Sequence, residues 1–127
     1  MDGLKKAAPL IARVLLAILF IMSGIGKLTG AEAMAGYFGA LGIPLPGISV
    51  YLVGIFELAA GLAIVVGYQT RNAALLLAAF SIASALLAHT NFADQTQMIM
   101  FLKNLGLAGG LLLLWVHGPS GMAIDKD

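Results

Sequence analysis

The residues best placed to do chemistry are a carboxylate and an amine inside apolar runs. Glu57 lies at the centre of the second long apolar run, with Gly54 and Gly61 on the same helical face, and Lys103 enters the fourth run. A charged group at mid-bilayer is costly unless it is paired, hydrated or used. Small residues mark helix contacts, so we expect Glu57 to point inward and Lys103 to be its partner. Such a pair either fixes helix register, or takes a proton and holds a polar ligand head.

A histidine and an amide extend this candidate site. His89 follows the third apolar run, on the side from which Lys103 enters the fourth. It is a candidate proton donor or acceptor at an external opening, because imidazole titrates near neutral pH, and an ordinary interfacial histidine is the alternative. Asn104 can hydrogen-bond across helices. We therefore take Glu57, Lys103 and His89 as candidate catalytic residues and Asn104 as a candidate ligand contact.

Two cations, one in the first run and one at its end, complete the set of candidate residues. Arg13 lies about one turn inside the run, and Lys27 follows on the same helical face. The long side chain of Arg13 is expected to snorkel to the membrane interface. Both cations are candidate ligand contacts.

Metal and thiol chemistry are not expected. The chain has no Cys, which removes disulfides, thiolate metal sites, iron–sulfur clusters and any thiol relay carried by the chain itself. His89 and His117 end successive antiparallel runs, so they fall on opposite membrane faces and cannot share one haem or one metal. We predict no metal site and no haem.

Composition and run length define the elements that must position these residues. Hydrophobic residues make up 61% of the chain, charged residues 10%, and the mean hydropathy is +1.00. Too few charges remain to coat a soluble core, so lipid must cover it. The runs 9–26, 48–67, 72–88 and 98–116 each match the hydrocarbon thickness of a bilayer. The sequence predicts an all-α integral membrane protein, a four-helix transmembrane bundle in a single domain, 1–127.

The links between the runs predict the topology. The link 68–71 is too short for anything but an antiparallel hairpin, so spans two and three are expected to be neighbours. The segment 31–41 is predicted to be a short interfacial helix with Met34, Tyr37, Phe38 and Leu41 on one side. It forms a lid or lies on the headgroups, and Tyr37 is a candidate ligand contact.

The distribution of charge predicts orientation and excludes one class of partner. Lys5, Lys6, Arg71 and Lys126 fall on the side of the termini, whereas Lys27 flanks the other side. The positive-inside rule therefore places both termini in the cytoplasm. The formal net charge of +1 offers no basic stripe, so nucleic-acid binding is not expected.

An ordered set of short motifs resembles the DoxX family over essentially the whole chain. It consists of Arg13 with Phe20, the run Ser23-Gly24-Ile25-Gly26-Lys27-Leu28, Gly42-Ile43-Pro44, Glu57 with Gly61-Leu62, Thr70-Arg71, and Phe101-Leu102-Lys103-Asn104-Leu105 with Gly109-Gly110. The resemblance implies a four-helix bacterial inner-membrane protein, of a family named from a subunit linked to sulfur-compound oxidation with quinone as acceptor and often labelled an oxidoreductase. Arg13, Lys27, Glu57, Lys103 and Asn104 are its family-like polar residues.

Three functions stay open at this point, and the sequence does not decide whether the protein is an enzyme. The first is a quinone-linked oxidoreductase subunit, in which Lys103 or His89 donates to a quinone carbonyl, Glu57 passes protons, and a soluble redox partner completes electron transfer. The second is a non-enzymatic membrane anchor or assembly subunit that recruits a soluble partner through its outer loop or tail. The third is a permease for a small anion or weak acid, which would require a homo-oligomer.

Overall fold

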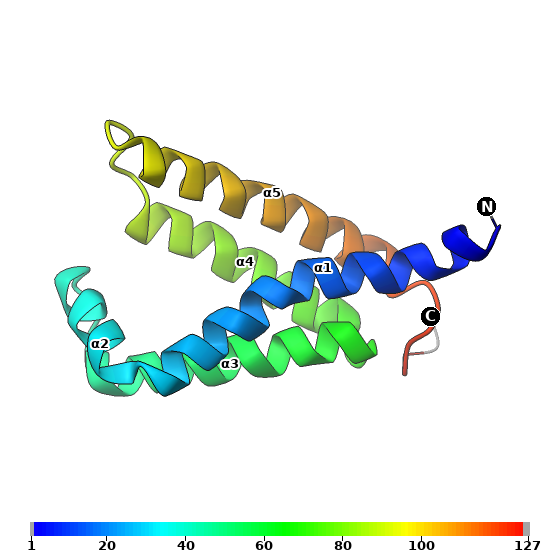
Figure 1. Cartoon of the computed structure of the whole chain (residues 1–127), viewed down its shortest axis with the longest axis horizontal. Helices are drawn as coiled ribbons and strands as arrows, with labels where there is room; N and C mark the ends of the chain where they lie inside the picture. Colours follow the sequence, from blue (N-terminus) through cyan, green and yellow to red (C-terminus); the bar gives the residue numbers. More distant parts are fainter. Residues whose placement is uncertain (1, 126–127) are drawn as a thin grey trace.

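The computed structural model describes residues 2–125 and contains five helices (Figure 1). They are α1 (Asp2–Thr29), α2 (Ala31–Ala40), α3 (Pro46–Val66), α4 (Thr70–Ala88) and α5 (Gln95–His117). All but α2 are long and apolar enough to cross a membrane. The prediction of an all-α bundle with four spans and a short helix between spans one and two is confirmed. The first helix is longer than its predicted span, and Pro9 lies inside it.

The four spans form two pairs, α1 with α3 and α4 with α5, and far fewer contacts join the pairs. The pairs meet at the end of the bundle that carries both chain termini and separate toward the end that carries α2 (Figure 1). We call these the terminal end and the α2 end. The predicted hairpin between spans two and three exists, with Gly67 and Gln69 in left-handed conformations at its turn. Its two helices diverge beyond the turn, so their main neighbours are α1 and α5.

Glycine allows α1 and α3 to cross closely. A Cβ atom added to Gly24 would lie 2.7 Å from the carbonyl oxygen of Gly54 and 2.8 Å from the amide nitrogen of Leu58. A Cβ on Gly61 would lie 2.9 Å from the side chain of Ile21. Small residues let transmembrane backbones approach in this way, because helix association in lipid relies on packing rather than on a hydrophobic driving force.

The core between the spans is small and rich in alanine. Its buried members include Ala17, Ile64, Leu77 and Leu111. Large apolar side chains on the outer faces of every span are exposed instead. This distribution is the reverse of a soluble domain and fits helices whose outer faces contact lipid.

A C-terminal tail, residues 118–125, closes the terminal end. Arg13 Nη2 donates to the carbonyl oxygens of Gly121 at 3.1 Å and Met122 at 2.6 Å. The Ile124 and Asp125 amides donate to the last carbonyls of the α3 region, at 3.0 and 2.7 Å. The tail therefore fastens α1 to the α3–α4 turn.

The carboxylate of Asp125 binds the start of α4. Its two oxygens accept hydrogen bonds from the amides of Gln69 at 3.0 Å and Thr70 at 2.8 Å. Free amides at a helix N-terminus favour a negative charge. Hydrogen bonding from Thr70, and then from the Gln69 amide, lowers the pKa of Asp125 below its ordinary value of 3.8. The tail thus supplies the cap that α4 lacks in its own sequence.

Candidate functional site

The buried carboxylate of Glu57 forms an ion pair with Lys27 across the α1–α3 contact. Lys27 Nζ lies 2.8 Å from Glu57 Oε1, and it donates a hydrogen bond of 2.8 Å to Ser23 Oγ. Glu57 is 3% exposed. The two atoms are close enough for an ion pair but are not aligned for a hydrogen bond. Among residues 2–125 no donor is hydrogen-bonded to Glu57 Oε1, so this oxygen can accept a hydrogen bond.

The direction of helical side chains explains why Lys27 reaches Glu57 from the last turn of α1. Side chains in a helix lean toward its N-terminus, so the Lys27 side chain leans back into the bundle, over Ser23. Its Cβ would lie 3.1 Å from a Cβ on Gly54, which places Lys27 about two turns into α3. Lys27 is therefore inside the bundle and not on its flank, where the sequence reading had it.

The predicted pairing of Glu57 with Lys103 is wrong in this structure. Lys103 is exposed, and its Nζ contacts Met100 Sδ at 3.6 Å. Its helix, α5, packs on α4, whereas Glu57 belongs to α3, whose close partner is α1. Lys103 and Glu57 nevertheless line one pocket.

This inner pocket has a volume of about 300 Å³ and lies between all four spans. It contains the Lys27–Glu57 pair together with Ser81, Lys103 and Asn104, and its apolar walls include Phe20 and Phe80. A second pocket of about 350 Å³ shares part of this lining and opens between α2 and α4. Small-molecule sites in proteins commonly combine apolar walls with a few polar groups in this way.

Ser81 and Asn104 are the polar residues on the wall formed by α4 and α5. Asn104 Nδ2 donates to the carbonyl oxygen of Ser81 at 3.2 Å, which is the cross-helix bond expected of Asn104, made to backbone rather than to a hydroxyl. The Ser81 hydroxyl is buried and has no hydrogen-bond partner within residues 2–125. A buried polar atom without a partner is rare in proteins and marks a place where a ligand can bind.

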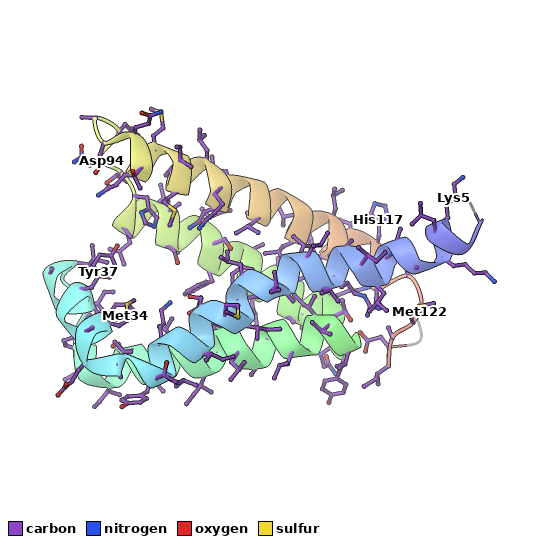
Figure 2. The ribbon with its side chains drawn as sticks, viewed as in Figure 1. Lys5, Met34, Tyr37, Asp94, His117 and Met122 are labelled. Carbon is purple, nitrogen blue, oxygen red and sulfur yellow. The ribbon has the colours of Figure 1, made fainter. Side chains whose placement is uncertain are left out.

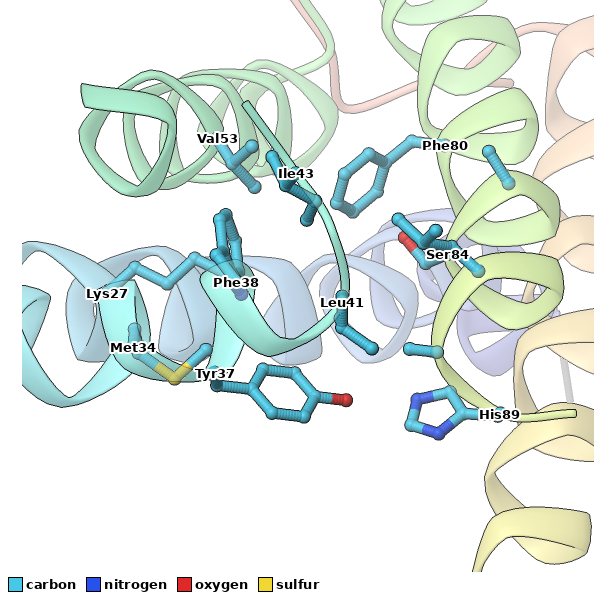
Figure 3. Close-up of a pocket in the computed structure, with 13 residues that line it drawn as sticks. Lys27, Met34, Tyr37, Phe38, Leu41, Ile43, Val53, Phe80, Ser84 and His89 are labelled. Atoms are coloured by element: carbon cyan, nitrogen blue, oxygen red, sulfur yellow. The ribbon is translucent and has the colours of Figure 1, made fainter. Parts of the chain in front are cut away.

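Tyr37 and His89 lie at the mouth, where the two pockets share lining (Figure 3). Met34, Tyr37 and Phe38 of α2, and Leu41 directly after it, all line the second pocket, so the predicted face of this helix covers the α2 end. In Figure 3 the Tyr37 hydroxyl is directed toward His89. Partial burial, and secondarily the charge of Lys103, lowers the pKa of His89 below 6.5. His89 is therefore neutral at pH 7 and can donate or accept a hydrogen bond.

Arg13 is the candidate that the structure separates from the rest. It is 1% exposed and bound to the C-terminal tail, so the expectation that it snorkels to the interface is wrong. The carbonyls of the tail provide acceptors inside the protein, and the side chain does not need to reach water to find them. Of the predicted site residues, Glu57, Lys27, Lys103, His89, Asn104 and Tyr37 thus share the connected pockets at the α2 end, and Arg13 holds the terminal end.

Sequence reasoning missed the contribution of Ser23 and the structural role of Asp125. Ser23 lies four residues before Lys27, a spacing at which helical side chains meet, so this hydrogen bond had a signal in the sequence. Asp125 follows a turn-rich segment, and nothing in its local sequence indicates that it caps a helix 55 residues earlier.

Comparison with known proteins gives one family and two full-length relatives. The DoxX family model matches residues 8–90. The chain is 43% identical to inner membrane protein YqjF of Escherichia coli over 126 residues, which covers 99% of this chain and 95% of the relative. It is 33% identical to inner membrane protein YphA of the same organism over 122 residues, 92% of this chain and 87% of that one. These relatives extend the match through α5.

A more distant match carries an activity in its name. The protein named "putative oxidoreductase CatD" of Bacillus subtilis is 33% identical over 69 residues, 54% of this chain and 50% of its own length. No solved structure matches the chain.

Proposed function

The chain belongs to the DoxX family of membrane proteins, and from that premise we propose that it is a quinone-binding subunit of a membrane oxidoreductase. The observation that carries the proposal is the ion pair Lys27–Glu57 and the unpartnered Ser81 hydroxyl on the walls of one apolar pocket within the bilayer. The name of the CatD relative supports a redox role.

The pocket fits the head of a quinone by the positions of its donors. A quinone presents a flat ring with a carbonyl at each end. Lys27, Tyr37 and His89 line both pockets and Ser81 and Lys103 line the inner one, and all five side chains carry N–H or O–H donors. The rings of Phe20 and Phe80 supply apolar walls for the ring faces.

The tail of such a ligand has an exit between α2 and α4. The pocket there is lined mainly by apolar side chains, among them Phe38, Leu41, Ile43 and Leu87. An isoprenoid chain that follows this lining passes Lys27, which both pockets share, and then meets mainly apolar side chains on its way to the lipid. The same lining makes α2 a cover over the bound head.

When bound, a quinone takes up two electrons and two protons and becomes a quinol; a soluble redox partner is the source of the electrons in this proposal. The residues of the chain hold the ligand and its protons. Lys27 donates a hydrogen bond to the inner carbonyl, and Glu57 Oε1 accepts one from the hydroxyl that replaces it. Neutral His89 donates at the mouth and exchanges protons with water.

Quinone retention on purification tests the proposal. The protein is purified in mild detergent, its organic extract is analysed by mass spectrometry, and binding of a short-tailed quinone is titrated. We expect the wild-type protein to retain quinone, and Glu57→Gln and Ser81→Ala to retain several-fold less. Ser49→Ala is the matched control, because the Ser49 hydroxyl bonds the Pro44 carbonyl outside the pocket. Retention that is absent from the wild type, or equal in all variants, would contradict the proposal.

A non-enzymatic anchor is the second candidate, and one observation favours it. The Lys27–Glu57 pair joins the two most closely packed spans, so it can act as a lock alone. The C-terminal tail is bound to the bundle, and α2 and the α4–α5 link offer further surfaces for a soluble partner. A co-purifying soluble protein, together with no retained quinone, would establish this role instead.

We also propose that both termini are cytoplasmic. Lys5, Lys6 and Arg71 lie at the terminal end, which supports this orientation under the positive-inside rule. The absence of Cys makes a clean test possible, since each introduced cysteine is unique. Gly3→Cys and Gly36→Cys have open space at opposite ends. In intact cells, an impermeant maleimide should label Gly36→Cys once the outer membrane is permeabilised, and not Gly3→Cys; the reverse pattern would refute the orientation.

A further inference from the structure

The terminal end contains a groove that the proposed quinone site does not use. It has a volume of about 520 Å³ and lies between α1 and α5, two helices with very few mutual contacts. Leu15 and Leu16 line one wall and Leu113 and Leu114 the other, while Pro119 and Ser120 of the tail close the end. The groove is long, apolar and open to the lipid side of the bundle.

A basic pocket lies directly above this groove. It has a volume of about 450 Å³, is lined by Lys5 and Lys6 with residues 120–122, and shares Ser120 with the groove below. Both lysines are exposed. Lys5 and Met122 lie together at this end of the molecule, far from Tyr37 and Asp94 at the other (Figure 2).

The charges around this pocket are complementary to an anion. Asp125, the acidic side chain of the tail, is occupied by the amides at the start of α4. Arg13, which borders the groove, donates to the tail and adds a third positive charge beneath the two lysines. The site thus combines ammonium groups at interface depth with an apolar channel that runs into the bilayer.

We propose that this groove is a binding site for an anionic phospholipid, with its phosphate at Lys5 and Lys6 and an acyl chain between α1 and α5. Basic pockets between transmembrane helices bind acidic lipid headgroups by this combination of charge and apolar contact. The lipid fills the space that the sparse α1–α5 contacts leave, and so stabilises the association of the two helix pairs, α1–α3 and α4–α5, at the end where they meet. This site is independent of the quinone pocket.

Tryptophan fluorescence offers a direct test, because Trp115 is the only tryptophan and follows Leu114 of the groove wall. The full chain is reconstituted in phosphatidylcholine vesicles with increasing fractions of phosphatidylglycerol brominated on its acyl chains, or of phosphatidylcholine brominated at the same carbons. Quenching gives the relative affinity for the two lipids near Trp115. We expect a preference for phosphatidylglycerol of about 25-fold, since each of the two lysines at the surface contributes about fivefold.

Two variants separate headgroup recognition from acyl-chain recognition. Lys5→Gln/Lys6→Gln should bring the preference close to one, while Lys103→Gln at the other end should leave it unchanged. Gly110→Leu should fill the groove, because its new side chain points at Leu16, with Cβ 3.0 Å from Leu16 Cδ2. Gly109→Leu is the matched control, since a Cβ there meets nothing within 4 Å.

Competition by inorganic phosphate distinguishes a lipid from a free anion. At constant ionic strength, phosphate should not reduce quenching by the brominated anionic lipid. Equal quenching by the two lipids in the wild type, or an unchanged preference in Lys5→Gln/Lys6→Gln, would overturn the proposal. So would loss of the preference on adding phosphate, which would show a site for the free ion, and so would equal effects of Gly110→Leu and Gly109→Leu.

Discussion

The two ends of the bundle satisfy buried charge in different ways. At the α2 end, Glu57 meets the side chain of Lys27 on the wall of a pocket, and the Ser81 hydroxyl beside it has no partner within the described residues. At the terminal end, Arg13 meets the backbone of the tail, and Asp125 meets the amides of α4. One end leaves hydrogen-bonding capacity for a ligand, and the other uses it to close the structure.

The proposed ligand site and the contacts that hold the helix pairs together therefore lie at opposite ends of the bundle. The two helix pairs diverge at the α2 end, so a ligand can enter there without breaking contacts between them (Figure 1). The two pairs are joined at the terminal end, where helix–helix contacts are few and hydrogen bonds of the tail connect the helices instead.

Removal of one partner of the buried ion pair should cost the most stability. Lys27→Met leaves the Glu57 carboxylate buried and unpaired, so we expect the free energy of unfolding to fall by about 3–5 kcal/mol. Lys27→Met/Glu57→Leu should recover most of that loss, because no charge then stays behind. Denaturant unfolding in detergent measures both. Lys103→Met, at an exposed amine, should change it by less than about 0.5 kcal/mol; a loss as large as that of Lys27→Met would mean that Lys103 is the true partner.

Loss of the arginine should release the tail and leave the other end intact. Arg13→Met removes charged hydrogen bonds to two carbonyls, and we expect a loss of about 2–4 kcal/mol. Hydrogen exchange of the Ile124 and Asp125 amides, which bond the end of α3, should accelerate strongly. In Lys27→Met the same amides should keep their protection relative to global unfolding. If both variants expose the tail equally, the two ends are not independent.

A methyl group at the crossing of α1 and α3 should destabilise the pair that carries the ion pair. Gly24→Ala places Cβ against the backbone of Gly54 and Leu58, which cannot rotate away, so we expect a loss of about 1–3 kcal/mol. Gly26→Ala is the control in the same helix, because its Cβ meets nothing within 4 Å and alanine is the better helix former. Equal melting temperatures for the two variants would show that the crossing is not tightly packed.

The smallest effect should come from the acid of the tail, and it should depend on pH. The lowered pKa of Asp125 means that its contribution to stability is present above the ordinary value of 3.8 and is lost as pH falls through the lower value in the folded protein. Asp125→Asn should lower stability by less than about 1 kcal/mol at pH 7, since the carboxylate is screened by water. The gap in melting temperature between wild type and variant should close as the pH falls below 3.8 and through the lower pKa of the folded protein. A gap that stays constant would show that the charge is not what stabilises the α4 cap.

Periodicity and charge were sufficient to predict the helices. Each span follows from a run of apolar residues long enough for a bilayer, and residues 31–41 follow from the Met34, Tyr37, Phe38 and Leu41 stripe that the structure places on a pocket. The inward direction of Glu57 also followed, because Gly54 and Gly61 on its face allow a close neighbour. These are local properties, and they read directly from spacing.

The choice of partners did not follow from spacing. Whether Glu57 meets Lys27 or Lys103 depends on which helix packs against α3 and at what depth, and both lysines are compatible with the sequence. The course of the tail was equally hidden, because the acceptors for Arg13 are backbone carbonyls, which every residue carries.

The amino-acid sequence is sufficient to predict that this chain crosses a membrane four times and that one acid, Glu57, lies within the bundle. It also gives the basic side chains that could pair with this acid. The tertiary structure was needed to show that α1 and not α5 supplies the amine that pairs with Glu57, and that Arg13 binds the tail. The physical reason is that apolar length and helical spacing act within a single helix, whereas an ion pair or a cap requires two segments at one depth, and depth is set by how the helices cross.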